Sequence, residues 1–343
     1  MPFHNVIGHE ATITALQAAA SGGRLAHAYL FHGDIAIGKR LTAFRFAQAL
    51  NCERTETANP PDACGLCRSC LQIGARTHPD FFVIEPDREL ATPQIKIEEI
   101  RGLEQQMVYR PLVGERKICL IDDADRMTIG ASNALLKTLE EPPDHSLFML
   151  ISSRPAALPA TIRSRCQQLR FAVPARTQVE AALIRDREKT PADARLLAVF
   201  SEGRIGEAFS ADAGQIRTRQ REVLELVSRH TLQSSALLLT AAESLHKSER
   251  AQDTLAWLAR WIRDVVFVRV GGDPDQLLFS EHIQALEACA RQADTDSLLL
   301  LLQDIEHTEQ QSGRHVNLQI ALENILLRLR DAVFPPALVP SSS

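Results

Sequence analysis

Short apolar runs separated by helical patterns fill the first half of the chain. The runs lie at 29–32, 81–84, 118–121, 147–151 and, more weakly, 168–171. Apolar residues at helical spacing follow Lys39 and recur around 95–108 and 131–141. The last of these helices is expected to end at Pro142-Pro143, because proline removes backbone donors. Strands that alternate with helices predict a parallel sheet with helices on both faces.

The pattern changes after Pro174. Alternating and β-branched runs do not recur, and Ala, Leu and Arg stand at helical spacing instead. We expect an α/β domain at 1–175, a small helical unit at 176–212 with a turn at 203–206, and an all-helical domain at 213–335. Residues 336–343 read as a tail. Trp257 and Trp261, one helical turn apart, are expected to pack in the core of the last domain rather than to form a ligand site.

Composition limits the classes of protein that fit this pattern. The chain has 343 residues, of which 45% are hydrophobic and 24% charged, which indicates a globular protein of two or three domains. A net charge of -5 and 5% aromatic residues argue against a protein that coats nucleic acid by itself. The first residues show no cationic segment followed by an apolar stretch, and the Leu run at 298–302 is too short to span a bilayer, so we expect a cytoplasmic protein.

Residues 33–40 read GDIAIGKR and resemble the phosphate-binding loop G-x-x-x-x-G-K-S/T. Gly33, Gly38 and Lys39 fit that motif, but Arg40 stands where a hydroxyl should bind magnesium. The segment follows a predicted strand and opens a predicted helix, so descent from a nucleotide-binding loop is favoured over chance. We expect the loop to be suited to phosphate but not to hydrolysis.

Carboxylates follow directly after the apolar run at 118–121, at Asp122, Asp123 and Asp125. Asp122 lies where the magnesium-associated aspartate of a Walker B strand lies, at the carboxyl end of the strand, where open α/β sheets bind ligands. Active ATPases of this class place Glu next, whereas Asp123 is one methylene shorter. Because positioning dominates phosphoryl transfer, this shortening is expected to be costly. The alternative is that Asp122, Asp123 and Asp125 only solvate the end of a strand.

Four cysteines crowd into one stretch, at Cys52, Cys64, Cys67 and Cys70. Four thiolates are a ligand set that tetrahedral zinc prefers, and they leave no position for a reacting water, so we expect one structural zinc ion in a module at 52–70. Free thiols are the alternative. A zinc finger that reads DNA is disfavoured because the module carries few basic residues, chiefly Arg54 and Arg68.

An arginine pair stands in Thr-Ile-Arg-Ser-Arg-Cys at 161–166, after the fourth predicted strand. An exposed arginine usually pairs with a surface carboxylate. A guanidinium on a short rigid turn is also suited to act as an arginine finger on a neighbour's γ-phosphate. Spacing alone does not decide between these roles.

Several strings together resemble the bacterial clamp-loader AAA+ family. They are VIGHE at 6–10, HAYLFHG at 27–33, NALLKTLEEPP at 133–143, LPATIRSRC at 158–166 and the four-cysteine insertion. The resemblance covers the first 175 residues with specific motifs. It implies an AAA+ core with a zinc-module insertion, followed by a helical lid and an all-α collar domain that serves oligomerisation.

The resemblance also implies partners and roles. Members of the family form a hetero-pentamer of delta, delta-prime and three gamma or tau subunits, which uses ATP to open the sliding clamp and place it on primed DNA. The arginine of the Ser-Arg-Cys motif, here Arg165 by position, reaches the ATP of the adjacent subunit. The sensor residue after the fourth strand falls on Ser152 or Ser153. The lid arginine of active members falls on Gly206, with Arg204 two residues away.

Three elements of hydrolysis, at Arg40, Asp123 and Gly206, are therefore altered, while the arginine that serves a neighbour is present. This combination predicts a non-hydrolysing stator subunit with weak or absent ATP or ADP binding and no ATPase activity of its own, within a DNA polymerase holoenzyme. An ATP-hydrolysing gamma/tau-like motor subunit is the alternative. A zinc-dependent nucleic-acid-binding protein without subunit partners is disfavoured by the acidic charge.

Overall fold

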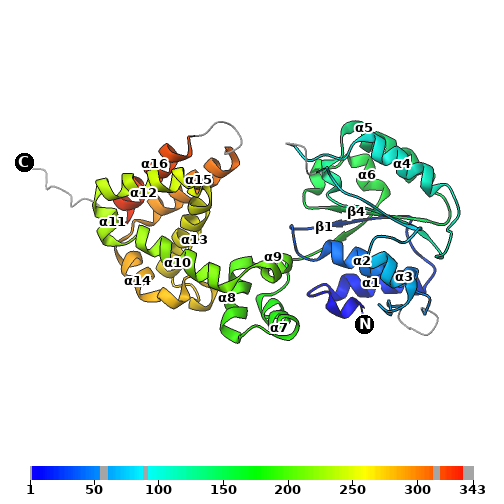
Figure 1. Ribbon diagram of the computed structural model, residues 1–343, viewed down its shortest axis with the longest axis horizontal. Coiled ribbons are helices and arrows are strands. Elements are labelled where there is room, and N and C mark those ends of the chain that lie inside the picture. The colour runs from blue at the N-terminus through cyan, green and yellow to red at the C-terminus, as the bar shows by residue number, and fades with distance from the viewer. Residues whose placement is uncertain (1, 55–60, 88–91, 312–316, 335–343) are drawn as a thin grey trace, which may run out of the picture. The chain divides into compact units, whose positions relative to one another are not determined.

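A computed structural model describes residues 2–54, 61–87, 92–311 and 317–334. The chain divides into two compact units, Met1–Ser210 and Ala211–Ser343 (Figure 1). The tail expected at 336–343 lies outside the described residues.

The first unit is built on a parallel sheet of five strands in the order β2-β3-β4-β1-β5. The strands are β1 (Ala28–His32), β2 (Phe81–Ile84), β3 (Lys117–Ile121), β4 (Ser146–Ser152) and β5 (Gln167–Arg170). Each begins and ends within a residue of the apolar run that predicted it, and every pairing between neighbours is parallel. The predicted α/β fold class is confirmed.

Helices cover both faces of this sheet (Figure 1). On one face lie α1 (Glu10–Ser21), α2 (Lys39–Leu50) and α3 (Arg68–Gly74), and on the other α4 (Ile97–Met107), α5 (Ile129–Glu140) and α6 (Ala160–Arg165). Alternate residues of a strand point to opposite faces. In β1, Tyr29 and Phe31 accordingly belong to the first core, while Ala28 and Leu30 belong to the second. Two apolar cores therefore hold the sheet and fix the carboxyl ends of its strands.

Local chemistry sets the ends of the helices that border the strand ends. The loop before α2 begins at Gly33, whose φ is +146°, and a Cβ there would lie 2.3 Å from the Phe171 carbonyl oxygen, so this position requires glycine. Thr128 caps α5 by accepting a hydrogen bond from the Ala131 amide at 3.2 Å. Helix α5 ends at Glu140, just before the two prolines, as predicted.

A helical group completes the first unit: α7 (Arg176–Arg187), α8 (Pro191–Ser201) and α9 (Ile205–Ser210). The turn expected at 203–206 is shorter than predicted. Glu202 and Gly203 have positive φ, but Ile205 and Gly206 already form the first turn of α9. This early start places the Gly206 backbone beside the phosphate loop.

The described part of the second unit is helical. Its helices are α10 (Ala213–Leu226), α11 (Arg229–Gln233), α12 (Ser235–Lys247), α13 (Ala251–Arg269), α14 (Ile283–Gln292), α15 (Thr295–Gln311) and α16 (Leu318–Val333). Trp257 and Trp261 of α13 are buried, which confirms the expected core role. Among the described residues, no helix combines the length and apolar character needed to cross a membrane.

Candidate functional site

The phosphate loop lies between β1 and α2, as predicted, but its lysine serves the loop itself. Lys39 Nζ donates hydrogen bonds to the carbonyl oxygens of Gly33, at 2.7 Å, and Asp34. The side chain is buried, and burial lowers the pKa of Lys39 against the opposing pull of nearby carboxylates such as Asp122. In this conformation the Lys39 ammonium group is hydrogen-bonded to the backbone of its own loop.

The Arg40 guanidinium pairs with the Asp122 carboxylate. It donates to Asp122 Oδ2 at 2.7 Å and to Glu85 Oε1, and Arg76 donates to the same Glu85 oxygen at 2.8 Å. Mg²⁺ prefers an octahedral set of oxygen ligands. Arg40 stands where the motif has an oxygen ligand, and it brings a positive charge instead. The Asp122 carboxylate is already paired with it. The residues present therefore do not fit the Mg²⁺ site that the loop motif implies.

The neighbouring aspartates differ in environment. Burial raises the pKa of Asp122, and the Arg40 charge opposes that shift. Asp123 adopts the left-handed conformation, with φ of +46°. Asp125 is turned away, since it pairs with Arg154 at 2.9 Å and accepts a hydrogen bond from Ser152 at 2.7 Å. The strand end thus supplies Asp122 and Asp123 to the site, but not Asp125.

A cavity of about 400 Å³ opens at these strand ends. Its lining includes Gly38, Lys39, Arg40, Asp122, Asp123 and Ser153. Of the two sensor candidates, Ser153 lines the cavity, whereas Ser152 is buried with its hydroxyl directed to Asp125. Gly33, at the start of the loop, is not among the residues that line the cavity.

The first turn of α9 also lines the cavity, through Ile205 and Gly206. Arg204 does not replace the missing lid arginine, because it pairs with Glu207 at 3.1 Å and lies 3.7 Å from Glu202. Sequence reasoning missed Glu85. Its position directly after an apolar strand was the same signal that identified Asp122, and it would have pointed to the same edge of the sheet.

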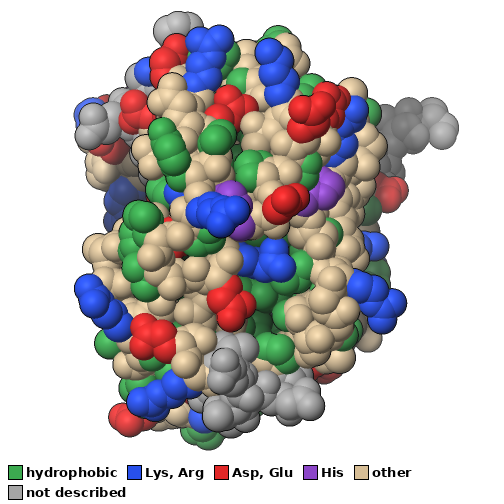
Figure 2. All heavy atoms as spheres, turned by 90° about the vertical axis from the view of Figure 1, so that its right-hand side faces the viewer, with side chains coloured by type: hydrophobic (Ala, Val, Ile, Leu, Met, Phe, Trp, Pro, Cys, Tyr) green, Lys and Arg blue, Asp and Glu red, His purple; other side chains and the backbone are tan. Residues whose placement is uncertain are grey.

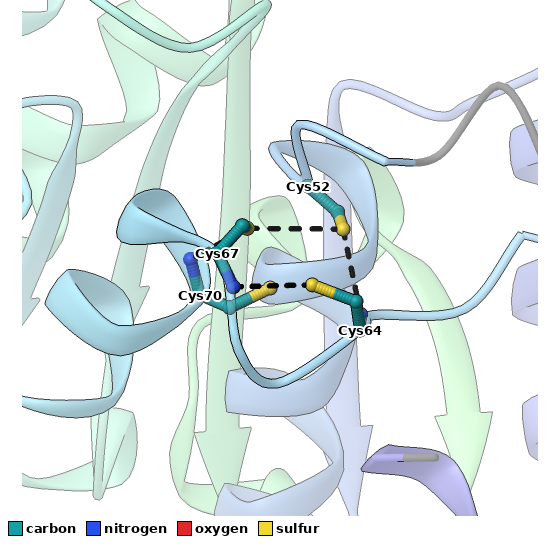
Figure 3. Close-up of side chains that lie close together, drawn as sticks. All are labelled: Cys52, Cys64, Cys67 and Cys70. Atoms are coloured by element: carbon teal, nitrogen blue, oxygen red, sulfur yellow. Dashed lines mark hydrogen bonds between the residues drawn. The ribbon is translucent and has the colours of Figure 1, made fainter.

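The cysteine module lies between α2 and β2 along the chain. Figure 3 shows its four cysteine side chains gathered close together. The four sulfur atoms of Cys52, Cys64, Cys67 and Cys70 lie within 4.8 Å of one another, and those of Cys52 and Cys67 are 4.0 Å apart. A tetrahedral ion with Zn–S bonds of about 2.3 Å requires sulfur separations of about 3.8 Å. The cluster is therefore close enough to hold one metal ion, and its donor set fits zinc.

Backbone amides are arranged to stabilise thiolates in this cluster. Cys64 Sγ accepts hydrogen bonds from the amides of Leu66 at 3.4 Å and Cys67 at 3.2 Å, and Cys67 Sγ accepts one from the Cys70 amide at 3.4 Å. Burial alone would raise the pKa of Cys64, but the Leu66 and Cys67 amides, together with the neighbouring thiols, lower it to about 6. Burial raises the pKa values of Cys52 and Cys70, so without a metal these two thiols stay protonated more readily. A metal requires the thiolate form, so this arrangement suits metal ligands.

Arg165 lies at the end of the short helix α6, at the surface. Its guanidinium donates to Glu140 Oε1 at 2.6 Å and to the Thr161 carbonyl oxygen at 3.0 Å, and 34% of the side chain is exposed. The structure therefore places Arg165 away from the residues that line the cavity of this chain.

Comparison with known proteins extends these observations. Residues 8–175 match the family described as DNA polymerase III, delta subunit, and residues 214–331 match its C-terminal part. DNA polymerase III subunit delta' of Pseudomonas aeruginosa is 38% identical over 211 residues, which are 61% of this chain and 63% of that protein. Subunit delta' of Bacillus subtilis is 28% identical over 313 residues, which are 90% of this chain and 92% of that protein.

Subunit tau of Escherichia coli is 38% identical over 213 residues, 61% of this chain and 32% of that protein. The chain thus spans less than two thirds of the P. aeruginosa delta' and E. coli tau relatives. Among solved structures, a gamma subunit-related protein of Thermotoga maritima covers 94% of this chain and 99% of its own, at 17% identity and a TM-score of 0.44.

A glycine-rich loop with a lysine lies between the first strand of a parallel sheet and its helix, which is the arrangement of P-loop proteins, but Arg40 stands at the position of their hydroxyl. Two delta-subunit families together match most of the chain, on both sides of the boundary between its two units. The chain therefore belongs to the clamp-loader subunit family of DNA polymerase III.

Proposed function

We propose that this chain is a non-hydrolysing stator subunit of the DNA polymerase III clamp loader. It would assemble with gamma or tau and delta subunits in a hetero-pentamer that loads the sliding clamp onto primed DNA. The pairing of Arg40 with Asp122 carries the proposal, because it removes the magnesium position from this subunit's own site.

Phosphoryl transfer depends on a metal ion that bridges the β- and γ-phosphates and on charges placed around the γ-phosphate. Arg40 offers no hydroxyl, Asp123 is shorter than the usual Glu, and Gly206 has no side chain to act from the lid. Lys39 is occupied by carbonyl oxygens of its own loop. These features support weak or absent binding of ATP and ADP and no turnover.

The second part of the proposal is that Arg165 acts as an arginine finger in trans. Its present partner, Glu140, is half exposed, and exposed ion pairs of this kind are worth about 0–1 kcal/mol. A γ-phosphate presented by a neighbouring subunit carries more charge than one carboxylate, so the guanidinium would exchange partners at little cost. Ser153, which lines the cavity, is the better candidate for the degenerate sensor position.

The cysteine module supports a structural zinc ion held by Cys52, Cys64, Cys67 and Cys70. When bound, the ion would supply cross-linking rather than Lewis-acid chemistry, because four protein thiolates complete a tetrahedral shell. The module packs against α2 through Gln48, whose amide donates to the Cys70 carbonyl oxygen at 2.6 Å. The ion would therefore brace the helix that carries the phosphate loop.

A gamma/tau-like motor is the second candidate. It is favoured by the identity to E. coli tau, 38% over 213 residues, which equals the 38% identity to P. aeruginosa delta' over 211 residues. The altered magnesium position argues against it. A nucleic-acid-binding protein without partners has less support. Figure 2 shows one face on which Lys and Arg side chains are interspersed with Asp and Glu rather than gathered into a basic field.

The deciding experiment is reconstitution. The chain is co-purified with gamma or tau and delta subunits, and clamp loading onto primed DNA is measured with and without it. The proposal expects a stable complex, loading that depends on this chain, and no ATP hydrolysis by the chain alone. Failure to join the complex, or ATPase activity of the isolated chain, would contradict it.

A further inference from the structure

Arg40 lies where three elements of the first unit meet. It stands in the first turn of α2, and its guanidinium reaches Asp122, directly after β3, and Glu85, directly after β2. Strands β2 and β3 are parallel neighbours, with Ile84 opposite Ile121. The two carboxylates therefore lie at the same edge of the sheet, and one guanidinium bridges them.

A divalent cation would occupy this position in a P-loop protein that binds Mg²⁺. There the hydroxyl after the loop lysine and the Walker B aspartate both serve the ion. Here the residue at the hydroxyl position donates N–H groups to that aspartate instead. A guanidinium carries its own positive charge and presents donors in a planar fork that matches carboxylates.

The surroundings favour a built arrangement over a chance contact. Arg76 donates to the same Glu85 oxygen as Arg40 does, and the two guanidinium carbons lie 5.8 and 5.7 Å from the centre of the Phe44 ring. Cation–π contacts of this kind add to the ion pairs and restrict the orientation of both guanidinium groups. Asp122 is only 13% exposed, so its charge needs a local counter-charge.

We propose that Arg40 is a covalently attached substitute for the divalent cation. It neutralises Asp122 and Glu85 and joins α2 to the ends of β2 and β3 without metal. It follows that the two carboxylates form a latent divalent-cation site, which appears when a hydroxyl replaces the guanidinium. This inference goes beyond the stator function, because it concerns the isolated chain and involves neither nucleotide nor partner.

The test uses the full-length chain without nucleotide. Thermal unfolding of the wild type and of Arg40→Thr is measured in EDTA and in increasing MgCl₂ at constant ionic strength. We expect no Mg²⁺ effect on the wild type. In EDTA the variant should unfold roughly 2–4 °C lower. Its midpoint should then rise with the logarithm of Mg²⁺ concentration, as linkage requires.

Three further variants make the test specific. Arg40→Thr with Asp122→Asn should lose the Mg²⁺ response. Arg76→Ala removes the other guanidinium from Glu85 and should stay insensitive to Mg²⁺, since Arg40 still holds Asp122. Arg40→Lys keeps a charge but lacks the fork, so it should fold and also remain insensitive to Mg²⁺. If Arg40→Thr is unfolded in EDTA, the expected result is that MgCl₂ restores its folding.

The proposal is wrong if Arg40→Thr matches the wild type in both EDTA and Mg²⁺. It is equally wrong if the wild type, or Arg40→Lys, is stabilised by Mg²⁺ in a saturable manner that needs Asp122. The first result would leave the stator function untouched. Mg²⁺ binding by the wild type would also remove the observation that carries the stator proposal, and reconstitution with the other subunits then tests that proposal separately.

Discussion

The backbone amide of Gly206 donates a 2.9 Å hydrogen bond to the carbonyl oxygen of Ala36, so α9 begins directly against the phosphate loop. A Cβ at position 206 would lie 3.3 Å from that oxygen, which leaves little room for a side chain. This is the position at which the family resemblance predicts the lid arginine. A backbone contact to the loop stands there instead, and Arg204 is held by Glu207.

The isolated chain is expected to release no phosphate from Mg-ATP, and Lys39→Ala should not change that result. Lys39 already donates to the Gly33 and Asp34 carbonyl oxygens, so its removal disturbs the loop rather than a reaction. Phosphate release is measured beside a gamma or tau subunit as positive control. Turnover that disappears in Lys39→Ala would show a working ATPase.

Replacement of Arg165 by Ala should lower the ATPase of the assembled loader, stimulated by DNA and clamp, together with clamp loading. An arginine finger contributes about 10³–10⁵ in rate at the site that it serves. Since only one of several sites would lose it, total hydrolysis should fall partially rather than vanish. Assembly of the variant complex is confirmed first by size-exclusion chromatography.

Glu140→Gln is the matched control for Arg165. It removes the charge of the carboxylate that the guanidinium now contacts, and an exposed pair of this kind contributes little to stability. Loading rates should therefore stay at the wild-type level. Equal rates for Arg165→Ala and the wild type would reduce Arg165 to a structural surface arginine.

Elemental analysis of the purified chain should find one zinc ion per molecule, and Cys64→Ser should lose it. The four sulfur atoms already lie within 4.8 Å of one another, and a single lost thiolate breaks a complete tetrahedral shell. The variant should also unfold at a lower temperature, because metal binding is coupled to folding. Cys289→Ala, in helix α14, is the control and should keep its zinc. Full zinc content in Cys64→Ser would refute the assignment.

Asp80→Asn should destabilise the first unit. The buried Asp80 carboxylate accepts hydrogen bonds from the amides of Leu112, Val113 and Gly114 at 2.7 to 2.8 Å, and an amide would turn a donor toward these donors. The expected loss in free energy of unfolding is about 1–3 kcal/mol. Urea unfolding near neutral pH measures it, and Asp144→Asn, at an exposed carboxylate, should change little.

The effect of Asp80→Asn should depend on pH. Burial alone would raise the pKa of Asp80, but the three amide donors outweigh burial and lower it. A lowered pKa in the folded state gives stability that is present above the unfolded pKa of about 3.9 and is lost as the pH falls through the folded value. The difference between wild type and variant should therefore shrink in acid. A constant difference down to the acid limit of folding would contradict this account.

The sequence by itself determined the elements, because their signals are local. Apolar runs and helical spacing placed five strands to within a residue. The cysteine cluster was also visible, since Cys64, Cys67 and Cys70 lie within one short segment. The family strings identified the clamp-loader subunit family before any contact was known.

Only the tertiary structure decided what the altered loop does. Arg40 is 82 residues from Asp122 and 45 from Glu85, and nothing local in the sequence connects them. They meet because β2 and β3 pair in parallel and end together beside the start of α2. The packed structure also shows that Ser153, and not Ser152, lines the cavity. It likewise shows that Glu140 is the partner of Arg165. Such contacts join distant parts of the chain, so they are set by packing and strand register rather than by any local pattern.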